Sequence, residues 1–300
     1  MSDYLANRRG IIALTSAGAL VSASDVFTKL VALNYPLGQV LFVRGLATSC
    51  FLLAILFAVH RAAWLGASVH SRVLVRAIFD ALANVAFIFA LSKMRIAELI
   101  AVNLVAPLLL TLLAAVFHKG EVGWRRWLAI LVGLLGTMFV VKPDLNAIDI
   151  WAIVALIAAL MSAIRDFVTR NMHPHIPSAV VTFVSSLAVT ASGLILAIGI
   201  GEQWKHLPSL DAWFLVGAAL FLTASTHLSV IAYRNVEIPV VAPFRYAILI
   251  WAGLAGYLVW HEIPDFWSFV GAGLIVGSGL YTLHRERARR RMLTAEMSPH

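Results

Sequence analysis

Ten long apolar stretches, separated by short polar segments, fill almost the whole chain. Each is close to the roughly 20 mainly apolar residues that an α-helix needs to cross the hydrocarbon core of a bilayer. The stretches are continuously apolar instead of alternating at every second residue, which disfavours a membrane β-barrel. The pattern therefore predicts ten membrane-spanning helices, at Gly10–Leu33, Leu37–Val59, His70–Ser92, Ala97–Phe117, Trp124–Val141, Asp149–Arg170, Ser178–Ile200, Asp211–Tyr233, Ile238–Trp260 and Phe266–His284.

The composition agrees with a chain that lies mostly in lipid. Of its 300 residues, 61% are hydrophobic and 13% are charged, whereas soluble domains carry about 25% charged residues. Soluble enzymes and disordered proteins are excluded, because too few charges are present to cover a water-facing surface or to prevent collapse. The single cysteine, Cys50, allows neither an intrachain disulfide nor a cysteine zinc cluster. We expect no cofactor and no metal.

The basic residues give the orientation. The net charge of +8 is spread over short loops and one tail, which is a topology signal and no sign of nucleic-acid binding. With a cytoplasmic amino terminus, the inside segments carry fourteen Lys and Arg and the outside segments four. The positive-inside rule then places both termini, residues 1–9 and the basic tail 285–300, in the cytoplasm, where the tail can contact anionic lipid.

The chain repeats itself after 141 residues. Matched pairs include Asp25 with Asp166, Thr28 with Thr169, Pro36 with Pro177, Phe42 with Phe183 and Glu121 with Glu262. The repeats, residues 10–142 and 148–284, each contain five predicted spans, and an odd number forces the second copy to insert upside down. The expected fold is an all-α integral membrane protein, with ten transmembrane helices arranged as two inverted five-helix repeats around a central cavity. Such a plan is typical of secondary transporters with alternating access.

Polar residues within the spans are the candidate site, because ionisable groups in a membrane usually face the bundle interior. Both signs of charge occur, which suits a zwitterion such as an amino acid, whereas a pump for cationic drugs is expected to bury carboxylates alone. An equally open alternative is that two pairs at four-residue spacing, Asp25 with Lys29 and Asp166 with Arg170, form ion pairs within their own helices. The candidates for substrate binding or gating are Asp25, Lys29, Arg44, Asp80, Asn84, Asn103, Arg165, Asp166, His227, Arg245 and Tyr246.

Helix breakers and small residues mark places of bending and close contact. Prolines remove a backbone hydrogen bond and kink a span, so the fourth and ninth spans are candidate hinges at Pro107, Pro239 and Pro243. Glycines repeat on the fifth and tenth spans at Gly133, Gly136, Gly273 and Gly277. Close helix packing is their ordinary use, either within one chain or between two. We expect a monomer or a weak homodimer.

The chain resembles the drug/metabolite transporter superfamily, in particular its EamA-like ten-helix exporters. The resemblance rests on the duplicated five-span unit, on Asp25-Val26-Phe27-Thr28-Lys29 followed by Pro36 and Arg44, and on the Glu121 and Glu262 turns. Within the superfamily the chain looks most like bacterial aromatic amino-acid exporters of the YddG type. The resemblance implies export of neutral amino acids and related metabolites across the bacterial inner membrane by alternating access.

Three alternatives stay open. One is a multidrug or nucleotide-sugar transporter of the same superfamily. Another is a membrane enzyme, disfavoured because no metalloprotease motif, nucleophile elbow or phosphate loop occurs, and because His173-Pro174-His175 is a weak metal site. The third concerns energy coupling, since Asp25, Asp80, Asp166 and His227 are all conceivable proton carriers.

Overall fold

The structure is a computed structural model that describes residues 2–58, 70–117, 124–141, 150–170, 172, 177–232 and 241–296. Over these residues it consists of helices joined by short connections, as the sequence predicts. The first repeat holds α1 (Ser2–Ala32), α2 (Leu37–Ala58), α3 (Ser71–Leu91), α4 (Ile96–Asn103), α5 (Ala106–Phe117) and α6 (Trp124–Val141). The second holds α7 (Ile150–Arg170), α8 (Ser178–Gly199), α9 (Ser209–Ala232), the 3₁₀ helix η2 (Ala242–Ala247), α11 (Ile248–Trp260) and α12 (Phe266–Glu296).

Within the described residues, seven segments are long and apolar enough to cross a bilayer, and three shorter apolar helices, at Leu128–Val140, Phe244–Trp260 and Phe266–Tyr281, complete the two repeats. Large apolar side chains such as Ile198, Ile250 and Phe266 are more than 70% exposed on the outside of the bundle. In water such a surface is strongly unfavourable, whereas in a bilayer it contacts lipid. The chain is a multi-pass membrane protein.

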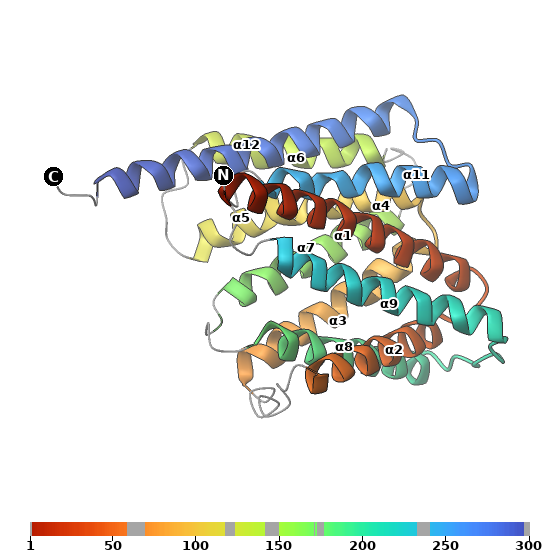
Figure 1. Cartoon of the computed structure of the whole chain (residues 1–300). Helices are drawn as coiled ribbons and strands as arrows, with labels where there is room; N and C mark the ends of the chain where they lie inside the picture. Colours follow the sequence, from red (N-terminus) through yellow and green to blue (C-terminus); the bar gives the residue numbers. More distant parts are fainter. Residues whose placement is uncertain are drawn as a thin grey trace.

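The contacts between the repeats follow a two-fold pattern. The first helix of each repeat packs on the third of the other (α1 on α9, α7 on α3), the second helices pack together (α2 on α8), and so do the fifth (α6 on α12). In Figure 1, α1 begins on the left side of the bundle, and α12 ends farther out on the same side, which we call the terminal end. This reciprocal pairing confirms two inverted five-helix repeats.

The fourth span is broken in both repeats. In the first, α4 ends at Asn103 and α5 begins at Ala106, after a turn at Leu104 and Val105. Pro107 has no backbone N–H to donate to the carbonyl of Asn103, so the α-helical ladder is interrupted there. In the second, η2 contains Pro243 and precedes α11. Residues 104 and 105 match 245 and 246 under the 141-residue shift, so the two breaks are equivalent. A hinge role for these prolines stays a prediction, and Pro239 lies outside the described residues.

Glycines let helices of opposite repeats approach backbone to backbone. A Cβ built on Gly193 of α8 lies 2.6 Å from the Phe42 nitrogen and 2.7 Å from the Gly38 oxygen, both in α2. On the other side of the bundle, a Cβ on Gly136 of α6 lies 2.8 Å from the Gly271 oxygen of α12. Such contacts are the usual role of small residues in membrane helices. They hold the two halves in register.

The glycines of α12 do not all serve this packing. Gly271, which the sequence pattern did not single out, is the residue that meets Gly136. Gly273 and Gly277 have no neighbouring atom within 4 Å of an added Cβ among the described residues, and both are exposed. The two faces differ because only one side of α12 rests on α6.

Replacing Gly193 with alanine is expected to lower the free energy of unfolding by about 1–3 kcal/mol, the usual effect of overpacking. The neighbouring atoms are α2 backbone, which cannot rotate away. The matched control is Gly273→Ala, which adds the same methyl group to open space and is expected to be neutral or stabilising. Thermal unfolding of the purified proteins in detergent compares the two. Equal melting temperatures contradict the assigned contact.

Candidate functional site: a polar cavity between the repeats

A cavity of about 400 Å³ lies between the repeats. Its walls come from α1, α2, α3 and α4 of the first repeat and from α7, α8, α9 and α11 of the second. Ile100 and Asn103 at the end of α4, and Ile248 at the start of α11, line it next to the two helix breaks. The predicted site residues that the structure brings together here are Asp25, Arg44, Asp80, Asn84, Asn103 and Arg165.

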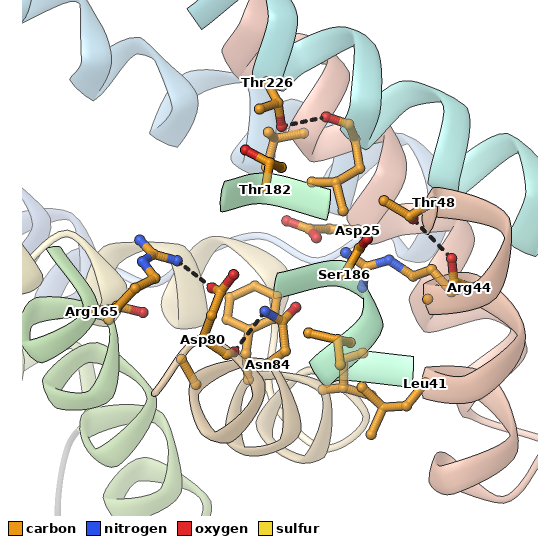
Figure 2. Close-up of a pocket in the computed structure, with 18 of the residues that line it drawn as sticks. Asp25, Leu41, Arg44, Thr48, Asp80, Asn84, Arg165, Thr182, Ser186 and Thr226 are labelled. Carbon is orange, nitrogen blue, oxygen red and sulfur yellow. Dashed lines mark hydrogen bonds and ion pairs between the residues drawn. The ribbon is translucent and has the colours of Figure 1, made fainter. Parts of the chain in front are cut away.

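Asp25 of α1 and Arg44 of α2 face each other across one part of this cavity (Figure 2). They are 3% and 6% exposed. Asp25 Oδ2, Arg44 Nε and Arg44 Nη1 have no hydrogen-bond partner among the described residues. Buried ionised groups are normally satisfied by partners, and leaving them unsatisfied is expensive. Among the described residues, the Asp25–Arg44 pair therefore holds one acceptor and two donors without a partner, on two side chains that line the cavity.

A second set of charges, from α3 and α7, lines another part of the cavity wall. Arg165 Nη1 donates to Asp80 Oδ1 at 2.8 Å, and Arg165 Nε donates to Asp166 Oδ1 at 2.9 Å. Arg76 Nη1 lies 3.7 Å from Asp80 Oδ2, one helical turn away on α3. We call Arg76, Asp80, Arg165 and Asp166 the α3–α7 charge cluster. Its two cations and two anions cancel.

Hydroxyl groups and apolar side chains form the rest of the wall. Thr48, Thr182, Ser186 and Thr226 reach the cavity from α2, α8 and α9 (Figure 2). Several hydroxyls satisfy their donors on their own helix: Thr48 Oγ1, for example, donates to the Arg44 carbonyl at 2.8 Å. Their lone pairs and the apolar carbons around them suit a solute with both polar and apolar parts.

Lys29 does not reach the cavity. It lies in the last turn of α1, at the end of the bundle opposite the terminal end, where Nζ donates to Glu262 Oε1 at 2.9 Å and to the Met94 carbonyl at 2.8 Å. Its Nζ also lies 4.7 Å from the centre of the Trp260 ring. Glu262 Oε2 accepts a hydrogen bond from the Ile96 nitrogen at 3.3 Å, in the first turn of α4. The structure thus pairs Lys29 with Glu262 and ties both repeats together.

Four further candidates also lie away from the cavity wall. Asp166 is turned to Arg165, and His227 of α9 and Arg245 of η2 are exposed. Tyr246 is buried in the largest apolar core, where its hydroxyl occupies the space above Gly279 that a Cβ would fill. Their part in binding or gating stays a prediction. Glu121 and the His173-Pro174-His175 fragment lie outside the described residues.

Arg76 is the charged wall residue that sequence reasoning missed. Its Nε donates to Thr169 Oγ1 at 3.0 Å and its Nη1 donates to Ser185 Oγ. The signal was present in the sequence, since Arg76 and Asp80 stand four residues apart on one predicted helix. The hydroxyl residues of the wall carried no such signal, because serine and threonine are common inside membrane helices.

A bundle of two inverted repeats that encloses a polar cavity next to broken helices defines a secondary membrane transporter. Sequence comparison agrees. Two segments of the chain, residues 8–142 and 149–283, match the EamA-like transporter family. The protein belongs to this family.

Curated relatives carry different substrates. The chain is 24% identical over 269 residues to an S-adenosylmethionine uptake transporter of Rickettsia felis, and the matched region covers 89% of each chain. It is 27% identical over 194 residues to a riboflavin transporter of Vibrio cholerae, with 64% of each chain covered. A pseudopaline exporter of Pseudomonas aeruginosa is 23% identical over 278 residues, covering 90% of this chain and 94% of that one.

A solved crystal structure has the same fold. The superposition covers 96% of this chain and 98% of the solved chain, with a TM-score of 0.58 and 19% sequence identity. At this identity the likeness concerns the fold alone, so the substrate has to be argued from the cavity.

Proposed function

We propose that the protein carries zwitterionic amino acids or amino-acid derivatives across the membrane by alternating access of the cavity. The observation that carries this proposal is the Asp25–Arg44 pair, which is buried and only partly satisfied. An α-amino acid presents an ammonium group and a carboxylate on one carbon. The ammonium can bond to Asp25 and the carboxylate to the Arg44 guanidinium, a strong charge-assisted combination.

The charge balance of the cavity supports a substrate without net charge. The Asp25–Arg44 pair sums to zero, and so does the α3–α7 charge cluster. A drug cation is expected to need an excess of carboxylates, and a nucleotide sugar an excess of cations. S-Adenosylmethionine, the substrate named for the Rickettsia relative, shares the α-amino-acid group, although its sulfonium adds one positive charge to the zwitterion. A membrane enzyme is disfavoured, because the family and the named relatives are transporters.

The proposed setting is the bacterial inner membrane, with the terminal end in the cytoplasm. The fourteen basic residues of the predicted inside segments support this orientation. Export is the proposed direction and rests on the resemblance to exporters, since the named relatives include both uptake and export carriers. A carrier that alternates without a coupled ion follows the substrate gradient in either direction.

Counterflow in proteoliposomes tests the substrate class. Vesicles loaded with unlabelled phenylalanine are expected to accumulate labelled phenylalanine, and excess unlabelled leucine, which is also a zwitterion without net charge, is expected to compete. Riboflavin, a cationic drug and a nucleotide sugar complete the panel, with and without an imposed pH gradient. Transport of only the drug or only the sugar contradicts the proposal, and a requirement for the pH gradient identifies proton coupling. Empty liposomes and liposomes with the Arg44→Gln variant are the controls.

A further inference from the structure

Asp80 occupies a special position in the α3–α7 charge cluster, because each of its two carboxylate oxygens faces a different arginine. Oδ1 accepts from Arg165 Nη1 at 2.8 Å, and Oδ2 lies 3.7 Å from Arg76 Nη1. The side chain of Asp80 is 14% exposed, and that of Arg76 is equally enclosed. Asp80 is therefore the shared counter-ion of two guanidinium groups from opposite repeats.

Only part of the cluster faces the cavity. Arg76, Asp80 and Arg165 line it, whereas Asp166 lies behind Arg165 and does not. The cavity face of the cluster thus consists of two cations and one anion, and the balancing anion, Asp166, is not part of the cavity wall. Loss of the Asp80 carboxylate turns this face into a pair of arginines with no anion between them.

Both arginines are fixed by groups other than Asp80. Arg165 is bound through Nε and Nη2 to Asp166 Oδ1, each at 2.9 Å. Arg76 donates to Thr169 Oγ1 at 3.0 Å and to Ser185 Oγ. These bonds hold the guanidinium groups in place when the Asp80 charge is removed. A carboxylate from outside the protein can then take the same position, because arginine binds carboxylates with two well-directed donors.

We propose that Asp80 determines the charge selectivity of the cavity by acting as a built-in substitute for a substrate carboxylate. Together with Asp166, which pairs with Arg165, it neutralises Arg76 and Arg165, so that the cavity accepts solutes without net charge and rejects dicarboxylic ones. A dicarboxylic solute is rejected because its second carboxylate meets the Asp80 carboxylate, which repels it, at the place where a cation is needed to bind it. This inference rests on the proposed function, since it concerns how the same cavity selects among amino-acid-like solutes.

The test measures ligand binding by the shift in melting temperature of the detergent-purified protein, with phenylalanine, glutamate, succinate and lysine as probes. Asp80→Asn keeps the shape and removes the charge. Glutamate and succinate are expected to stabilise this variant at about tenfold lower concentration than the parent, the gain of one charge-assisted hydrogen bond. The double variant Asp80→Asn/Arg165→Gln restores the balance of charge and is expected to lose that gain.

A mirror variant keeps the inference testable even if Asp80→Asn does not fold. Arg165→Gln leaves the cluster with one excess anion, so lysine is expected to become the preferred probe. Asp211→Asn removes a carboxylate that lies outside the cavity wall and accepts a hydrogen bond from the Tyr35 hydroxyl, in the turn after α1, and it is expected to leave the probe ranking unchanged.

The outcomes separate the two proposals. If phenylalanine stabilises the parent and both variants while acidic and basic probes show no change of rank, Asp80 does not set the selectivity and the inference is overturned. If phenylalanine stabilises none of them but succinate stabilises Asp80→Asn, the inference stands and the amino-acid assignment fails. If no probe distinguishes the folded variants from the parent, the inference is overturned.

Discussion

Substitution of Arg44 by glutamine is expected to reduce the counterflow rate about a hundredfold or more. Arg44 is 6% exposed and holds two unpartnered donors at the cavity, where a substrate carboxylate is expected to bind. Truncation of one partner of a buried charge pair typically weakens binding by about 2–5 kcal/mol, which is about 30-fold to several thousandfold. Glutamine retains a donor and much of the side-chain volume but no charge. The measurement is the initial rate per folded transporter.

Two companion variants separate binding from folding. The Arg44→Gln change leaves Asp25 without a counter-charge, so Asp25→Asn/Arg44→Gln restores neutrality and is expected to fold but not to transport. Arg95→Gln removes an arginine that lies outside the cavity and pairs with Glu98 on α4 at 3.4 Å. This exposed pair contributes little, so we expect near-normal transport. A normal rate for Arg44→Gln rules out Arg44 as the carboxylate site.

Substitution of Lys29 by glutamine is expected to lower the free energy of unfolding by about 3 kcal/mol, the lower end of the range for a broken buried ion pair. The lower end applies because the Glu262 side chain is 18% exposed, whereas that of Lys29 is only 6% exposed. The change leaves Glu262 without its cation and the Met94 carbonyl without its Nζ donor. Because these groups belong to both repeats, the loss also loosens the contact between them.

The double variant Lys29→Gln/Glu262→Gln is expected to lose less free energy of unfolding than the losses of the two single variants added together, since neither charge is then left without its partner. The control is Lys93→Gln, which removes an exposed lysine 5.9 Å from the Trp151 ring in the same region, with little expected effect. Melting temperatures followed by tryptophan fluorescence provide the comparison. If Lys93→Gln and Lys29→Gln lower the melting temperature equally, the Lys29–Glu262 contact is not the cause.

The fold was largely predictable from the chain, because a bilayer leaves few choices. A backbone in lipid has to satisfy its own hydrogen bonds, so each apolar stretch of sufficient length becomes a helix. The repeat with an odd number of spans then leaves only an inverted arrangement. Even the interruption of the fourth span followed from Pro107 and Pro243, because proline cannot donate to the helical ladder.

What the sequence by itself determined is therefore the series of apolar spans, their duplication, and the set of polar residues within them. The tertiary structure decided which of those residues meet. Spacing along α1 allows Lys29 to pair with Asp25, yet Lys29 pairs with Glu262, 233 residues away, and Asp25 is left facing Arg44 and the cavity. Arg165 likewise reaches Asp80 across 85 residues. The reason is physical: sequence periodicity fixes the face on which a side chain lies, but its partner depends on which helix of the other repeat packs against that face.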